Sequence, residues 1–380
     1  MTDDPPPNPA LLPAGLRDLL PPEAETEASA VEAVMAAFAA HGYQRVKPPL
    51  LEYEDSLLNG TGGGVADQSF RLIDPETHRM VGLRADITPQ VARIATTRLA
   101  HAPRPLRLSY AGQVLRVRAS GLPPDRQVAQ AGIELIGHDS PIADAEVVLV
   151  AAEALATVGL VRVSFDLTMP PLVQSLLNEA APTPERRAAL ARALDRKDAA
   201  AVAEHGGALA DSLAELLLAA GPAGAALEAL ARVDLPPGAR VHATRLADAV
   251  AAIRARAPDL ALTVDPVEFR GFRYHSGVCF EVYSPGHHEA LGRGGRYECG
   301  DGEPATGLTL FPDAVLRAAP ARSARPRVFL PFGTDPDEAA GLRAGGYATV
   351  AGLEVLTDVM AAAREQGCGQ LWRGGDLVRV

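Results

Sequence analysis

The chain has 380 residues, of which 47% are hydrophobic, and it carries a formal net charge of −11. This length predicts two or three domains, and the acidic charge argues against a protein that holds nucleic acid on a broad basic surface. The cysteines Cys279, Cys299 and Cys368 lie far apart without CxxC spacing, so neither a zinc site nor a disulfide framework is expected. The acidic, proline-rich start is unlike a signal peptide and no apolar run reaches transmembrane length, which predicts a cytoplasmic protein that does not enter the membrane.

The first predicted element is a helix that opens at Pro21 and closes at Gly42. Its apolar side chains recur at helical spacing and are Val31, Val34, Met35 and Phe38. Residues 43–53 are expected to be extended. The glycine-rich loop at residues 59–64 lacks the Lys-Ser/Thr ending of a P-loop, which favours a flexible cover over a phosphate cradle.

Residues 69–73 and 80–83 are predicted to form a hairpin around Asp74-Pro75. Thr88-Pro89 then predicts the start of a helix, with the Thr88 hydroxyl as its cap and proline in the first turn.

Residues 113–137 alternate between apolar and polar side chains around a Gly-Leu-Pro-Pro break, which predicts two antiparallel strands and a flexible loop. One face of this second hairpin is expected to be core and the other polar. The core face comprises Leu115, Val117, Ile133 and Leu135. The polar face comprises Arg116, Arg118, Gln130 and Glu134.

The rest of the chain predicts a helix at about residues 141–158, a helical insertion at about 170–235 and strands from residue 269 onwards. Arg325-Pro326 is expected to be a linker to a small α/β module. The expected domains are therefore residues 1–325 and 326–380.

Three segments are candidates for a ligand site. The polar face of the second hairpin is by itself more typical of solvated surface, but Gly132 between Gln130 and Glu134 leaves room for a ligand to approach the backbone. In LRADITPQ, Asp86 and Thr88 are explained equally well by helix capping. In RGFRYHSG, residues 270–277, the polar and aromatic side chains indicate either a site or a half-exposed strand.

Taken together, these segments resemble the catalytic core of a histidyl-tRNA synthetase, a class II synthetase. The resemblance covers roughly residues 10–320 and rests on LLPAGLRDLLPPEAE, GLRADITPQVAR, QVLRVRASG, QAGIELIG, RGFRYHSGVCFE and GGRYECGDGEPATGLTL. It implies an α+β fold with an antiparallel sheet flanked by helices.

The chain departs from that family where ATP would bind. The arginine that holds the α-phosphate matches Arg116, but the family's acid is replaced by Arg118, and the arginine that contacts the γ-phosphate is replaced by Ala314. Cations placed around the phosphates stabilise the transition state of nucleotide activation, so no histidyl-adenylate is expected. Residues 326–380 are also too few for the family's anticodon-binding domain, and no binding of tRNA is expected.

The residues that contact the substrate amino acid in the synthetases mostly have counterparts in this chain. By the resemblance, Asp86 and Gln130 match contacts to the substrate ammonium, Glu134 a contact on the imidazole side, and Arg270 the arginine near the carboxylate. Tyr274 and His275 stand where the family has paired tyrosines around the imidazole, so His275 is a departure. The implied histidine-binding residues are Asp86, Thr88, Arg116, Gln130, Glu134, Arg270, Tyr274 and His275. No catalytic residue, metal or cofactor is implied.

A site that keeps its amino-acid contacts and loses its ATP contacts resembles the regulatory subunits of ATP phosphoribosyltransferase. That resemblance implies a chain without catalysis that activates a short-form catalytic subunit and relays histidine inhibition in the first step of histidine biosynthesis. It also implies dimers of this chain within a hetero-octamer. An active histidyl-tRNA synthetase, or a related protein that uses another amino acid, stays open as an alternative.

Overall fold

A computed structural model describes residues 10–58, 63, 66–119, 124–181, 183–269, 274–300, 302–321 and 324–380. Its contacts divide the chain into two compact units, Met1–Pro320 and Ala321–Val380. Arg270, the loop of the second hairpin at residues 120–123 and nearly all of the glycine-rich loop lie outside the described residues. Within the described part of the chain, every helix is too short or too polar to span a bilayer.

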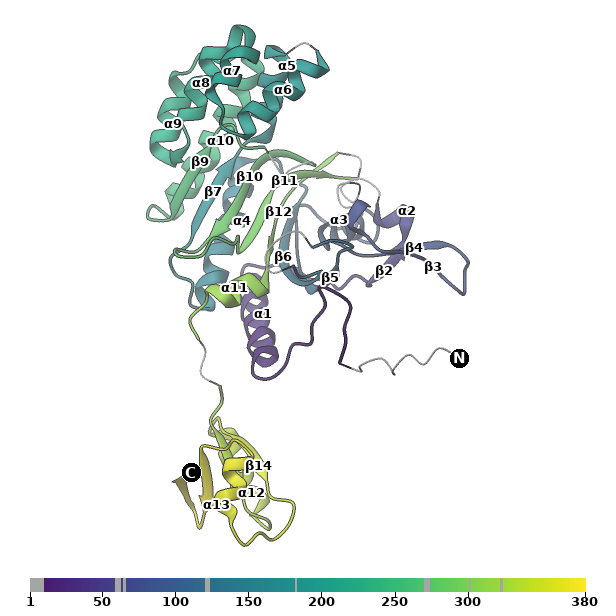
Figure 1. The fold of residues 1–380 in the computed structure, drawn as a ribbon, viewed down its shortest axis with the longest axis vertical. Coiled ribbons are helices and arrows are strands. Elements are labelled where there is room, and N and C mark those ends of the chain that lie inside the picture. Colours follow the sequence, from purple (N-terminus) through teal and green to yellow (C-terminus); the bar gives the residue numbers. More distant parts are fainter. Residues whose placement is uncertain are drawn as a thin grey trace, which may run out of the picture. The chain divides into compact units, whose positions relative to one another are not determined.

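The first unit is built on one large sheet whose neighbouring strands are mostly antiparallel (Figure 1). In spatial order its strands are β1 (Gln44–Arg45), β5 (Leu106–Leu115), β6 (Gln127–Ile136), β12 (Glu303–Leu310), β11 (Gly292–Cys299), β10 (His275–Tyr283), β7 (Ser164–Thr168), β9 (Ala261–Asp265) and β8 (Gly221–Pro222). The parallel pairs are β1–β5 and β7–β9. The predicted antiparallel sheet with flanking helices is confirmed.

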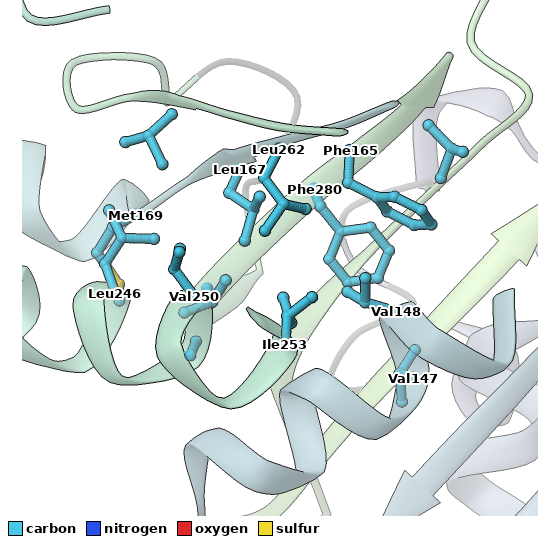
Figure 2. Close-up of a cluster of buried hydrophobic side chains, with 14 of the residues drawn as sticks. Val147, Val148, Phe165, Leu167, Met169, Leu246, Val250, Ile253, Leu262 and Phe280 are labelled. Carbon is cyan, nitrogen blue, oxygen red and sulfur yellow. The ribbon is translucent and has the colours of Figure 1, made fainter. Parts of the chain in front are cut away.

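One face of this sheet is covered by helices that carry the largest apolar core. The helices are α1 (Glu23–Ala40), α4 (Pro141–Thr157), α10 (Pro237–Arg256) and α11 (Pro312–Ala318). Figure 2 shows how side chains of α4 and α10 meet Phe165 and Phe280 of the strands. The predicted start of α4 is confirmed, because the Ser140 side chain accepts a hydrogen bond from the Ala143 N–H. On α1, Val34, Met35 and Phe38 are buried as predicted.

The other face is covered near β5, β6 and β11 by α3 (Thr88–Thr96), with a second apolar cluster around Val91 and Tyr110. Beside it lie α2 (Glu54–Leu57) and a small sheet in the order β2 (Leu51–Tyr53), β4 (Met80–Leu83), β3 (Arg71–Ile73). The predicted hairpin at residues 69–73 and 80–83 is confirmed, because β3 and β4 pair antiparallel.

The second predicted hairpin is confirmed as the antiparallel pair β5–β6, but its assignment of faces is partly wrong. Ile133 and Leu135 do lie in the large core, on the face of β6 that is opposite to the face of Glu134. However, β5 ends at Leu115, and Val117 is 36% exposed instead of buried. From Ala129 onwards β6 is buried on both faces, because helices cover both sides of the sheet there. The β6 part of the polar face, with Gln130 and Glu134, is therefore not a solvated surface, whereas Arg118, beyond the end of β5, is exposed.

Between β7 and β9 the chain is mainly helical. Besides α10, this stretch contains α5 (Pro170–Ala180), α6 (Pro184–Asp195), α7 (Ala199–His205), the 3-10 helix η2 (Gly207–Leu209), α8 (Ala210–Leu218) and α9 (Ala223–Arg232). Helices thus continue to Arg256, and α10 packs against α4 as well as α5.

The second unit is a small α/β module. It contains β13 (Arg327–Leu330), α12 (Pro336–Ala344), β14 (Ala348–Ala351), α13 (Val359–Glu365), β15 (Gln370–Arg373) and β16 (Asp376–Arg379). The sheet order is β14-β13-β15-β16, with β13 parallel to both neighbours and β16 antiparallel to β15.

Candidate functional site

The centre of the candidate site is the carboxylate of Glu134 on β6, which is 1% exposed. It accepts hydrogen bonds from the hydroxyls of Thr88 (2.9 Å) and Tyr297 (2.8 Å), and a longer one from Tyr110 (3.4 Å). A buried carboxyl group needs such donors because it has lost its hydration. Burial nevertheless raises the pKa of Glu134 to about 8, and the three hydroxyls only partly oppose that rise.

Two glycines make room for this arrangement. A Cβ at Gly307, which pairs with Glu134 across β12 and β6, would overlap with the Glu134 carboxylate. A Cβ at Gly132 would overlap with the phenol of Tyr110. The space that the sequence predicts beside Gly132 is therefore filled by the chain's own Tyr110, which also bonds Thr309 (2.7 Å).

Two polar side chains, Asp86 just before α3 and Gln130 on β6, bind backbone N–H groups at the start of this helix. Asp86 accepts a hydrogen bond from the Thr88 N–H (3.2 Å), and Gln130 accepts one from the Ile87 N–H (3.0 Å). The prediction that the Thr88 hydroxyl caps the helix is wrong: Ile87 is the cap residue, and the hydroxyl donates to Glu134. A capping role thus explains Asp86 in part, but it does not explain Thr88.

Aromatic rings form one wall of the site. Tyr274 stacks on His275 with 4.3 Å between ring centroids, and it meets Tyr297 edge-on at 6.0 Å. Burial, with a smaller effect of the nearby Arg293 cation, lowers the pKa of His275 to about 3. The imidazole of His275 is therefore neutral at physiological pH.

The predicted site residues fall into two adjoining cavities. Asp86, Thr88, Gln130, Glu134, Tyr274 and His275 line an inner cavity with about 20 Å³ of free space. Arg116 instead lines an outer cavity of about 580 Å³, together with Ala314. The exposed Arg118 does not line either of them. Arg270 lies outside the described residues, so its predicted contact is not placed.

Sequence reasoning missed four side chains of this region: Tyr110, Arg293, Tyr297 and Thr309. Arg293 and Tyr297 belong to GRGGRYE, residues 292–298, whose glycines by themselves indicate only a tight backbone path. A tyrosine or arginine at alternate positions of a glycine-rich strand was the available signal, since glycines leave such side chains space to turn inwards. Among the described residues, no group of three His, Cys, Asp or Glu side chains is placed to hold a metal ion.

The raised pKa of Glu134 predicts a pH-dependent stability. The folded chain holds a proton on Glu134 between about pH 4.5 and 8 that the unfolded chain releases, so its stability falls as the pH rises through this range. Glu134→Gln removes the ionisable group and is expected to make the unliganded protein more resistant to urea at pH 8 than the wild type. At pH 5 the variant should have no such advantage. Equal gains at both pH values would contradict the assignment.

The fold agrees with that of a known class of protein. Residues 15–315 match the family model described as histidyl-tRNA synthetase. A solved structure titled as an ATP phosphoribosyltransferase regulatory subunit/histidyl-tRNA synthetase, from Bacillus halodurans, superposes with a TM-score of 0.80 at 24% identity and covers 93% of this chain and 96% of its own. The chain thus has a histidyl-tRNA synthetase-like class II fold.

Sequence relatives narrow this class. The chain is 55% identical over 369 residues to an ATP phosphoribosyltransferase regulatory subunit from Gluconobacter oxydans, covering 97% of each chain. It is 53% identical over 382 residues to one from Rhodospirillum centenum, covering 100% of this chain and 99% of the relative. The protein belongs to the family of ATP phosphoribosyltransferase regulatory subunits, which are regulatory and not catalytic chains.

Proposed function

We propose that this chain activates a short-form ATP phosphoribosyltransferase catalytic subunit and mediates its feedback inhibition by histidine. The observation that carries the proposal is the pair of buried acids, Asp86 and Glu134, that line one small cavity with the aromatic ring of Tyr274. A buried carboxyl group with a raised pKa is well suited to gain a cationic or N–H partner, because that partner favours its charged form.

In this proposal Asp86 and the Gln130 side chain bind the ammonium of histidine, while Glu134 and Tyr274 bind its imidazole. Arg116 and Arg270 bind on the carboxylate side, and Thr88 and His275 complete the pocket. The free space of about 20 Å³ in the inner cavity holds about one water molecule, since one water needs roughly 10–15 Å³. Histidine is much larger, so its binding requires side chains to move and the inner cavity to extend into the outer one.

The outer cavity supports a regulatory and not an enzymatic role. Ala314 is buried in its wall, where a synthetase would place a cation on the γ-phosphate, and Arg118 points into solvent. With Ala314 at that place, the cavity of about 580 Å³ lacks the cation that would stabilise the γ-phosphate during nucleotide activation.

The same proposal covers assembly and location. The chain forms dimers, and these join catalytic subunits in a hetero-octamer in the cytoplasm, without binding tRNA and without a cofactor. The mass of the co-purified complex, measured by light scattering, tests the assembly directly.

The activity test mixes the purified chain with a short-form ATP phosphoribosyltransferase. The chain is expected to raise the activity of the catalytic subunit, because a regulator acts by contacting two states of its partner unequally. Histidine should then lower this activity through a coupling of roughly 1–3 kcal/mol, which is about 5- to 150-fold. Glu134→Ala should keep the activation and lose the inhibition. Unchanged activity on mixing, or unchanged inhibition in the variant, would refute the proposal.

A further inference from the structure

One arginine connects the inner and outer cavities. Arg293 lies on β11 between Gly292 and Gly294, and its side chain lines both cavities. The inner cavity carries the acids Asp86 and Glu134. A movement of the Arg293 side chain would therefore open the acidic cavity into the larger one.

Arg293 has a second guanidinium as a neighbour. Arg116 lines the outer cavity, and its Nε donates to the carbonyl of Ala85, the residue before Asp86. Burial is the main reason why the pKa of Arg116 is lowered; the Asp86 carboxylate opposes this shift and the Arg293 cation adds to it. Two like charges that line one cavity are stabilised by an anion placed between them.

The carboxylates that line the outer cavity interact with groups other than Arg293. Asp125 and Asp313 lie 3.9 and 3.7 Å from the guanidinium of Arg17, and Glu289 forms a salt bridge with Arg317 (2.8 Å). Glu281, opposite Arg293 in the strand register, accepts a hydrogen bond from Tyr283. Among the described residues, no carboxylate lies within 4 Å of the Arg293 guanidinium nitrogens.

Acidic and basic groups therefore follow one another in space: the inner cavity contains the acids, and the guanidiniums lie where it meets the outer cavity. A free amino acid carries the matching pair of charges, an ammonium and a carboxylate on one carbon. A phosphate-bearing ligand fits less well, because it offers several negative charges to a cavity that also contains four carboxylates.

We propose that Arg293, together with Arg116, binds the α-carboxylate of the amino acid held by Asp86 and Glu134, so that the site selects amino acids with a free carboxylate. This inference rests on the proposed function. Charge-assisted bonds from guanidinium to carboxylate are strong, and they are lost when the carboxyl group is esterified, removed or activated. The regulator would then respond to free histidine and ignore carboxyl-blocked forms of it.

Calorimetry on the full-length chain with histidine, histidine methyl ester and histamine provides the test. The wild type is expected to prefer histidine over the other two by roughly 10- to 100-fold, the range for hydrogen bonds to charged groups. Arg293→Ala should lower the affinity for histidine by a similar factor and change that for histamine less than about threefold, while Arg293→Lys should recover part of the loss. Arg118→Ala, a control on an exposed arginine, should match the wild type.

The outcomes separate this inference from the function on which it rests. If the wild type does not bind histidine, both are wrong. If it binds histidine and the methyl ester equally well, or if Arg293→Ala keeps the full preference for histidine, only the role of Arg293 is overturned. Urea unfolding of each variant shows whether a loss of binding reflects the carboxylate contact or a loss of the fold.

Discussion

Asp86→Ala and Glu134→Ala are each expected to weaken histidine binding by about 2–5 kcal/mol, because each leaves a charged or N–H group of the ligand buried without its partner. This corresponds to roughly 30- to 4000-fold in Kd. Both acids are almost completely buried, so water cannot replace the lost carboxylate. Isothermal titration calorimetry with the purified chain measures the effect.

Matched variants make this result specific. Glu134→Gln keeps the size of the side chain but cannot ionise when a cationic or N–H partner binds, so it should still lose most of the affinity. Glu298→Ala alters an exposed acid on β11 beside Tyr297, and it should bind histidine like the wild type. Wild-type affinity in both Asp86→Ala and Glu134→Ala would place the effector site elsewhere in the chain.

Arg296→Ala is expected to destabilise the fold by about 3–5 kcal/mol, the usual result of breaking a buried ion pair. Arg296 and Asp144 have side chains that are 4% and 3% exposed, and they form a salt bridge of 2.7 Å between β11 and α4. The same guanidinium donates to the carbonyls of His138 and Ser140 just before α4 (both 3.1 Å). Without it, the Asp144 carboxylate and these carbonyls lose their partner.

Arg317→Ala is the matched control for this prediction. Its salt bridge with Glu289 has similar geometry, but the side chains are 39% and 43% exposed. Exposed pairs contribute about 0–1 kcal/mol, because water and salt screen them. Equilibrium urea unfolding compares the two variants, and equal losses of stability would contradict the view that burial makes the Arg296–Asp144 pair important.

Several elements could be predicted from the sequence because their signals are local. The helix expected at about residues 141–158 is α4, and Val34, Met35 and Phe38 marked the buried side of α1. Alternation along residues 127–136 also placed Glu134 opposite Ile133 and Leu135 correctly. The order of motifs pointed to the family, which the comparisons confirm.

The sequence alone did not determine which surfaces cover each face. Alternation shows which side chains of a strand share a face, but it says nothing of the layers packed against that face. Gln130 and Glu134 were therefore expected on a solvated surface, although both are buried. Val117 was assigned to the core because it follows the same alternation, whereas β5 ends before it and Val117 is left exposed.

By itself, then, the sequence determined the family, the antiparallel sheet and four of the polar residues that line the inner cavity: Asp86, Thr88, Gln130 and Glu134. Only the tertiary structure decided that Tyr110 fills the space beside Gly132, that the Thr88 hydroxyl donates to Glu134 and that Arg293 borders both cavities. The physical reason is that these contacts join distant parts of the chain. Tyr110 and Thr309, for example, are 199 residues apart, and the hydrogen bond between them forms because β5 and β12 flank β6 in one sheet. Local patterns do not contain that information.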